Sequence, residues 1–230
     1  MPRFYQTPLT PQEIQRTAQA AVRALEENGL ECCLFGSTAC AIYGMENREP
    51  NDVDIVVLTE IQTEELKDLI LETDDNFYLI PSRDPNATHR VLWYALSSLE
   101  QPHLERKCKV DILVPGLLSI PRVPSQHIMY SENFPDIPLM PLLPLILLKL
   151  RGWSDHRVDE REYMQEKVPQ DEVDIEEMLQ LAVEEYDVHI RKEKWLPEWF
   201  IREAKERVGL FAKELPGSEA HWRDLGFFVS

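Results

Sequence analysis

Asp52 and Asp54 lie in the run Asp-Val-Asp-Ile-Val-Val-Leu, and they are the pair of residues in this chain whose types and spacing most plainly indicate chemistry. The β-branched residues around them predict a strand, in which residues i and i+2 point to the same side, about 7 Å apart. Two like charges beside a core are costly unless a cation neutralises them. Oxygen ligands of this kind suit Mg²⁺ (or Mn²⁺), completed by water and phosphate oxygens.

A second feature complements the two acids. The apolar run Cys33–Phe35 stops at Gly36-Ser37, and a short helical segment follows. A strand that ends in Gly-Ser and opens a helix directs free backbone N–H groups and a hydroxyl outward, where a phosphate can bind. The small residue lets the phosphate approach the backbone closely. Together the two features predict a site for a metal-bound triphosphate.

Gly36-Ser37, a spacer and then Asp52-Val53-Asp54 resemble the signature of the DNA polymerase β-like nucleotidyltransferase superfamily. In that signature a hydrophobic residue is followed by Gly, by Gly or Ser, by a spacer, and by Asp-x-Asp or Asp-x-Glu. The resemblance implies an α+β fold with a mixed sheet, an NTP substrate and Mg²⁺ (or Mn²⁺) held by the acids.

The segment that contains Tyr43-Gly44 and Arg48 looks most like the abortive-infection type E toxin branch of this superfamily. That branch has Gly, a short helix, Tyr-Gly, Arg, and a Ser or Thr shortly before Asp-x-Asp. Here the spacer is slightly long, and Asn51 stands where a hydroxyl residue is commoner. Arg48 is the candidate in this loop for contacting phosphate.

Three residues later in the chain extend the predicted site through the resemblance. Asp111, a single acid in an apolar strand, resembles the superfamily's third carboxylate, so that Asp52, Asp54 and Asp111 would bind two metal ions about 4 Å apart. Lys149, embedded among leucines, resembles the branch's helical lysine and would pair with the leaving pyrophosphate. Asp174 matches the acid that opens the next helix and is a further nucleotide-binding candidate.

The elements that position these residues follow from capping signals and periodicity. A capping box at Thr10-Pro11-Gln12-Glu13 opens a first helix that ends near Gly29. Its expected apolar face consists of Ile14, Ala18, Ala21, Val22 and Leu25. Strands are expected at 31–35, 52–58, 77–81, 90–96 and 109–114, and helices at 37–44, 63–72 with Thr63 as the cap, 141–153, 171–187 and 197–214. The connections expected between them include an irregular, proline-rich segment at 115–140 and a charged loop that ends at Pro169. Strands first and helices afterwards predict a mixed-sheet catalytic domain over 1–137 and a helical domain over 138–230 that completes the cleft.

Composition limits the partners. The formal net charge of −17 argues against non-specific binding to a polyanion, so a small molecule or a protein is favoured over RNA as the acceptor. The most apolar window, 137–150, is too short to span a bilayer and is interrupted by prolines. Four cysteines without metal-ligand spacing are interpreted as reduced core thiols, which suits a cytoplasmic protein. The sequence does not indicate the oligomeric state or which nucleotide base is preferred.

Three functions remain open. The first is metal-dependent transfer of NMP from an NTP to a hydroxyl or phosphate acceptor with release of pyrophosphate, carried by Asp52, Asp54, Asp111 and Lys149. The second is a nucleotide-binding or protein-interaction module that kept the fold and lost the chemistry. The third is a toxin-like enzyme acting on tRNA, for which Arg106, Lys107 and Lys109 would supply local positive charge.

Overall fold

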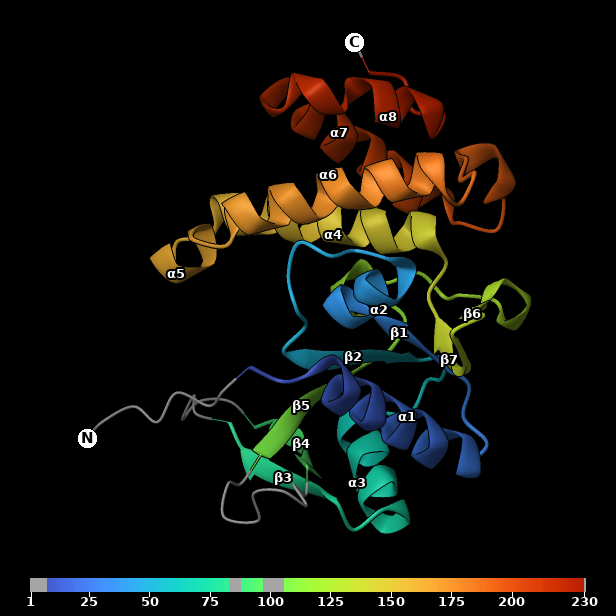
Figure 1. Ribbon diagram of the computed structural model, residues 1–230, viewed down its shortest axis with the longest axis vertical. Coiled ribbons are helices and arrows are strands. Elements are labelled where there is room, and N and C mark those ends of the chain that lie inside the picture. The colour runs from blue at the N-terminus through green and yellow to red at the C-terminus, as the bar shows by residue number, and fades with distance from the viewer. Residues whose placement is uncertain (1–7, 83–87, 97–105, 230) are drawn as a thin grey trace.

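A seven-stranded mixed sheet forms the centre of the protein, with helices on both of its faces (Figure 1). The structure is a computed structural model that describes residues 8–82, 88–96 and 106–229. Helices α1 and α3 cover one face, and α2 lies on the other, beneath α4 and α6. The expected α+β fold, with a helical C-terminal half, is confirmed.

In the first half of the chain, the helices and strands follow the expected order, and their bounds lie close to the expected ones. The strands are β1 (Cys32–Phe35), β2 (Asp52–Val57), β3 (Phe77–Pro81), β4 (Arg90–Leu96), β5 (Arg106–Leu113), β6 (Met129–Ser131) and β7 (Phe134–Leu139). The helices are α1 (Pro11–Glu27), α2 (Gly36–Tyr43), α3 (Thr63–Thr73), α4 (Leu142–Val158), α5 (Glu162–Gln165), α6 (Val168–Glu184), α7 (Glu198–Glu214) and α8 (Glu219–Asp224).

The order of the strands is β3-β4-β5-β2-β1-β7-β6. Strand β2 pairs antiparallel with β1 and parallel with β5, so the strand that carries Asp52 and Asp54 is central in the sheet. Val53 and Ile55 are completely buried and alternate with the two aspartates. The alternation directs the aspartates to the face opposite these two apolar side chains.

Helix α1 begins as its sequence predicts. Thr10 accepts a hydrogen bond from the Glu13 backbone N–H, and the Glu13 side chain accepts one from the Thr10 N–H, which completes the capping box. The helix buries the expected apolar face. The next expected cap was wrong: Gln62 occupies the N-cap of α3 without a side-chain hydrogen bond, and Thr63 is already helical.

The segment 115–140 is more regular than expected. It contains β6 and β7, and β7 pairs parallel with β1 at Leu139 and Leu34. Pro135 and Pro138 lie within β7. A proline removes one ladder hydrogen bond, and β7 tolerates this because its pairing with β1 spans little more than one residue.

The helical half begins with α4, which runs five residues past the expected end at Trp153. The charged loop expected before Pro169 contains α5, and α6 already begins at Val168. Pro169 therefore lies in the first turn of α6, where a missing N–H costs nothing, so it did not mark a boundary. The division of the chain at residues 137 and 138 stays a prediction.

The four cysteines are free and buried, as expected for core thiols. Within the described ranges, no helix is both long enough and apolar enough to cross a membrane.

Candidate active site

Three predicted acids form what we call the acidic row: Asp52 and Asp54 on β2, and Asp111 on β5. Asp54 pairs in register with Asp111, and Asp52 with Lys109. Partners in register lie about 5 Å apart and point to the same face, so the sheet gathers the three carboxylates on one surface.

Gly36 is required by the position of Asp54. A Cβ atom at residue 36 would lie 2.0 Å from Asp54 Oδ2, and the backbone of Gly36 has a φ of +66°. Both constraints exclude a larger residue. The strand-to-helix turn and the carboxylate are therefore packed directly against each other, which places the start of α2 beside the acidic row.

Burial makes the acidic row electrostatically unfavourable by itself. Burial, followed by the nearby charges of Asp52 and Asp111, raises the pKa of Asp54 to about 8. Burial also raises the pKa of Asp52, against the opposing charge of Lys109. A buried carboxyl group with a raised pKa lacks a nearby cation that would stabilise its ionised form. The three acids of the row offer oxygen ligands alone, which are the ligands that Mg²⁺ prefers.

Lys109 supplies part of the missing positive charge. Its Nζ lies 2.5 Å from Asp111 Oδ2, and both side chains are about one-third exposed. Burial lowers the pKa of Lys109, but its hydrogen bond to Asp111 and the negative charges of the acidic row together outweigh burial and raise the pKa overall. Among the described residues, no group of three or more His, Cys, Asp or Glu side chains is gathered closely enough to hold a metal ion.

A second group, here called the basic cluster, consists of Arg48, Lys149 and Asp174. Lys149 on α4 and Arg48 in the loop after α2 both pair with the Asp174 carboxylate, Arg48 at 2.8 Å. The Asp174 side chain is completely buried, and that of Lys149 is 11% exposed. The charge of Lys149 also lowers the pKa of Asp54, so the cluster lies within electrostatic reach of the acidic row.

Asp174 was expected to open its helix, and this expectation was wrong. The residue lies in the second turn of α6, because the helix begins at Val168. Burial raises its pKa, but the charge and hydrogen bond of Lys149 outweigh burial and lower the pKa overall. Asp174 is therefore ionised by its cationic partners rather than by the helix dipole.

The loop that carries Arg48 is fastened to α6 by a residue that the sequence did not single out. Glu177 accepts hydrogen bonds from the backbone N–H groups of Glu46 and Asn47, at 2.6 and 3.1 Å, and from the Asn47 side chain. Gln170 donates to both Asn47 and Asp174. The only sequence signal was position: Glu177 follows Asp174 by three residues, on the same side of the helix.

The remaining predicted residues have simpler surroundings. Ser37 is buried in the first turn of α2. The N-cap residue of this helix is Phe35, so Ser37 does not cap it. Thr38 donates a hydrogen bond to the Asp52 carbonyl, which ties α2 to the start of β2. The structure thus arranges the predicted site residues in two groups. One group contains Gly36, Ser37 and the acidic row, and the other is the basic cluster of Lys149, Arg48 and Asp174.

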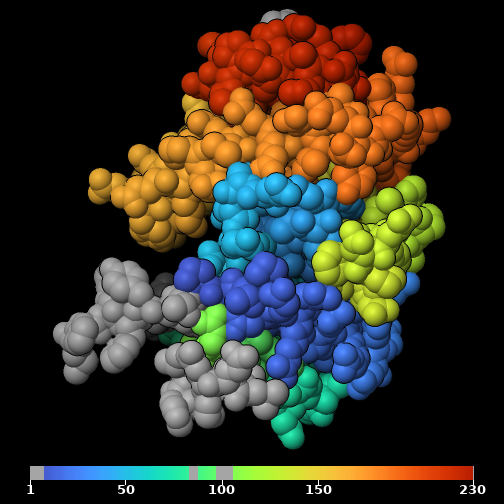
Figure 2. Space-filling view, in the orientation of Figure 1, coloured from blue at the N-terminus to red at the C-terminus, as the bar shows by residue number. Residues whose placement is uncertain are grey.

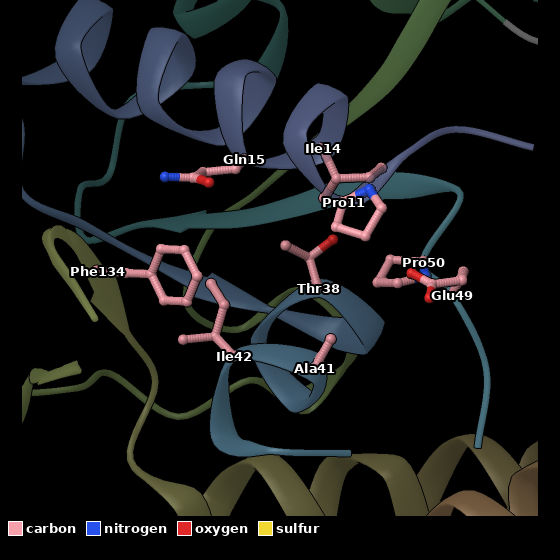
Figure 3. A pocket seen from close by; sticks show the side chains of 9 residues that line it. All are labelled: Pro11, Ile14, Gln15, Thr38, Ala41, Ile42, Glu49, Pro50 and Phe134. Carbon is pink, nitrogen blue, oxygen red and sulfur yellow. The ribbon is translucent and has the colours of Figure 1, made fainter. Parts of the chain in front are cut away.

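A pocket of about 120 Å³ opens behind α2, between the start of α1 and Phe134 (Figure 3). Its lining is largely apolar: Pro11, Ile14, Gln15, Thr38, Ala41, Ile42, Glu49, Pro50 and Phe134. None of the predicted site residues lines it. In Figure 2 the surface is hollowed below the gold atoms of α5, beside the light-blue loop that leads into β2.

The sequence matches no protein-family model and no curated protein. The fold, however, is similar to that of solved structures. An antigenic nucleotidyltransferase-like protein from Paracoccidioides brasiliensis shares 15% identity with a TM-score of 0.68, over 97% of each chain. A putative nucleotidyltransferase from Helicobacter pylori shares 14% identity with a TM-score of 0.51, over 94% of this chain and 84% of that one. The H. pylori protein JHP933 shares 14% identity with a TM-score of 0.52, over 94% and 79%. At these identities the likeness establishes a nucleotidyltransferase-like fold.

Proposed function

We propose that the protein transfers a nucleoside monophosphate from an NTP to a hydroxyl or phosphate group of an acceptor. The observation that carries the proposal is that an acidic row with fewer cations than carboxylates lies within electrostatic reach of a basic cluster with more cations than carboxylates. A metal-bound triphosphate supplies both missing charges: its metal ion suits the acids, and its phosphates suit Lys149 and Arg48.

In this proposal Asp52, Asp54 and Asp111 hold Mg²⁺ (or Mn²⁺), which would polarise the phosphoryl oxygens and neutralise developing charge. The N–H groups at Gly36 and Ser37 position the phosphates. An acceptor oxygen forms a bond to the α-phosphorus while the bond to the bridging oxygen breaks, and pyrophosphate leaves toward Lys149. Asp111 takes the acceptor's proton.

The acceptor is a small molecule or a protein in this proposal rather than RNA. The net charge of −17 opposes a polyanion. Arg106 pairs with Glu13, and Lys109 pairs with Asp111, so part of the basic charge that would favour a tRNA-directed toxin is already neutralised. The buried free thiols support a reducing, cytoplasmic location.

A second candidate is a module that binds nucleotide without transferring it. The Lys109–Asp111 pair favours this candidate, because an ammonium group stands where the third acid would meet a metal ion. The two candidates share the nucleotide site and differ only in turnover.

The test compares the melting temperature of the wild type with that of an Asp52→Asn/Asp54→Asn variant, in each of the four NTPs, with and without Mg²⁺ or Mn²⁺. About 100 Kd of a ligand that binds only the folded state adds roughly 2.7 kcal/mol to the free energy of unfolding. We expect a metal-dependent increase in the wild type that the variant lacks. No increase with any NTP would contradict nucleotide binding, and normal transfer by a folded Asp54→Ala variant would contradict the assigned chemistry.

A further inference from the structure

A hollow of about 230 Å³ adjoins the acidic row at Asp52. It is lined by Asp52, Trp93, Lys107 and Lys109, together with Asn51 and the segment Pro8-Leu9. We call it the acceptor hollow. It shares Asp52 with the predicted metal site but contains neither Gly36 nor the basic cluster.

The sheet register explains why these side chains meet. Trp93 on β4 pairs with Lys109 on β5, and Lys109 pairs with Asp52 on β2. The three residues therefore form one row across β4, β5 and β2, which are neighbouring strands of the sheet (Figure 1). Their register places them on the face that carries the acids. Lys107 precedes Lys109 by two residues on the same face, and its Nζ lies 4.6 Å from the centre of the Trp93 ring.

Lys109 is the residue that connects the hollow to the metal site. Its ammonium group is bound to Asp111, and it stabilises the ionised forms of the acids that surround it. A divalent ion that binds Asp111 must first displace this ammonium group. Once displaced, Lys109 retains its charge and its place in the wall of the hollow, and it then needs a new anion.

We propose that Lys109 is a built-in counter-cation that a divalent ion displaces from Asp111, and that the released ammonium group then binds an anionic group of the acceptor in the hollow. The inference rests on the proposed function and names the acceptor class: a small hydroxyl compound with a phosphate or carboxylate close to its reactive hydroxyl. Two lysines supply the charge complement, and Trp93 supplies an apolar wall against which the carbon skeleton packs. The volume suits a small molecule and does not admit a large one.

The first experiment measures the binding of Mn²⁺ alone by calorimetry. Lys109→Met removes the competing ammonium group, and we expect it to tighten Mn²⁺ binding about fivefold, the equilibrium equivalent of a strong, partly exposed ion pair. Lys107→Met removes the same charge two residues away, over Trp93, and is expected to change the affinity less than twofold.

The second experiment measures thermal stabilisation in Mg²⁺ by glycerol 3-phosphate, glycerate and uncharged glycerol. We expect the phosphate or the carboxylate compound, or both, to stabilise the wild type, and glycerol to have no effect. The two anions distinguish which group the hollow prefers. Lys109→Met is expected to weaken the stabilisation at least about fivefold in ligand concentration. The control Lys213→Met, an exposed position on α7, retains it.

The outcomes separate this inference from the proposed function. Wild-type protein that binds Mn²⁺ while Lys109→Met binds it no more tightly overturns the inference alone. Stabilisation by neither anion, or equal stabilisation of Lys109→Met, also overturns it. A wild type that fails to bind Mn²⁺ removes the metal site on which both proposals depend.

Discussion

The acidic row and the basic cluster both combine carboxylates with cations, but in opposite proportion. In the row, Lys109 pairs with Asp111, and the pKa of Asp54 rises to about 8. In the cluster one carboxylate has two cations, and the pKa of Asp174 falls. Burial opposes ionisation in both places, so the supply of cations decides the direction.

The difference shows which region has its carboxylates paired without a ligand. The cluster is a buried, ion-paired network that connects α4, α6 and the loop after α2, and it keeps one positive charge in excess. The row is an array of like charges that a divalent ion would complete. Changes in the cluster should therefore alter stability most, whereas changes in the row should alter ligand binding and pH response.

The largest effect is expected from Asp174→Asn. The change leaves Lys149 nearly buried without its carboxylate, and removal of one partner of a buried pair costs about 3 kcal/mol or more. Urea unfolding measures this loss. Asp171→Asn on the same helix, where the carboxylate pairs with the partly buried His156, is the control and should cost less than about 1 kcal/mol. Equal losses in the two variants would mean that the cluster is not the stabilising network.

An intermediate effect is expected from pH. The folded protein retains the Asp54 proton up to about pH 8, whereas the carboxyl group has an ordinary pKa of 3.8 in the unfolded chain. Between these values the folded state binds more protons, so the free energy of unfolding falls as pH rises. We expect the metal-free protein to melt roughly 3–6 °C lower at pH 8 than at pH 5.

Asp54→Asn removes this titration, so the same measurement on that variant is the control. The variant should show a flatter pH dependence and a higher melting temperature than the wild type at pH 8 in the absence of metal. A wild-type profile that rises from pH 5 to pH 8 and is unchanged by the substitution would show that the row is not short of cations.

The smallest effect is expected from Glu177→Ala. The change releases the loop at Glu46 and Asn47 but leaves the Arg48–Asp174 pair in place. A less constrained Arg48 should weaken NTP binding about threefold, the equivalent of part of one hydrogen bond. Thermal shift titration measures the affinity, and the exposed neighbour Glu176→Ala is the control. If both variants bind NTP as the wild type does, the hydrogen bonds of Glu177 do not position Arg48.

Local signals predicted the parts of this protein that local physics determines. The alternation in β2 predicted that Asp52 and Asp54 share a face, and the capping box predicted the start of α1. The pairing of Asp54 with Asp111 came only from the family resemblance, because nothing local states which strand lies beside β2. For the same reason, the sequence did not indicate that Trp93 lies beside Lys109 on the neighbouring strand.

Some signals were misleading or incomplete. Prolines predicted an irregular segment where β7 in fact forms, and Pro169 predicted a loop where α6 begins. Lys109 and Asp111 lie two residues apart on one strand, so their pairing could have been predicted from the same alternation. Glu177 could not, because the residues that it binds lie in a distant loop of the chain.

The parallel pairing of β2 with β5 has a consequence for the order of events in folding. In the sequence, α3, β3 and β4 lie between Asp54 and Asp111. The contact between these two residues therefore joins parts of the chain that are far apart in sequence. Such contacts form late, after most of the loop-closure entropy has been lost. A divalent ion that needs both carboxylates would then find no partner in early intermediates. We therefore expect it to lengthen the lifetime of the native state by slowing unfolding, and to leave the folding rate nearly unchanged.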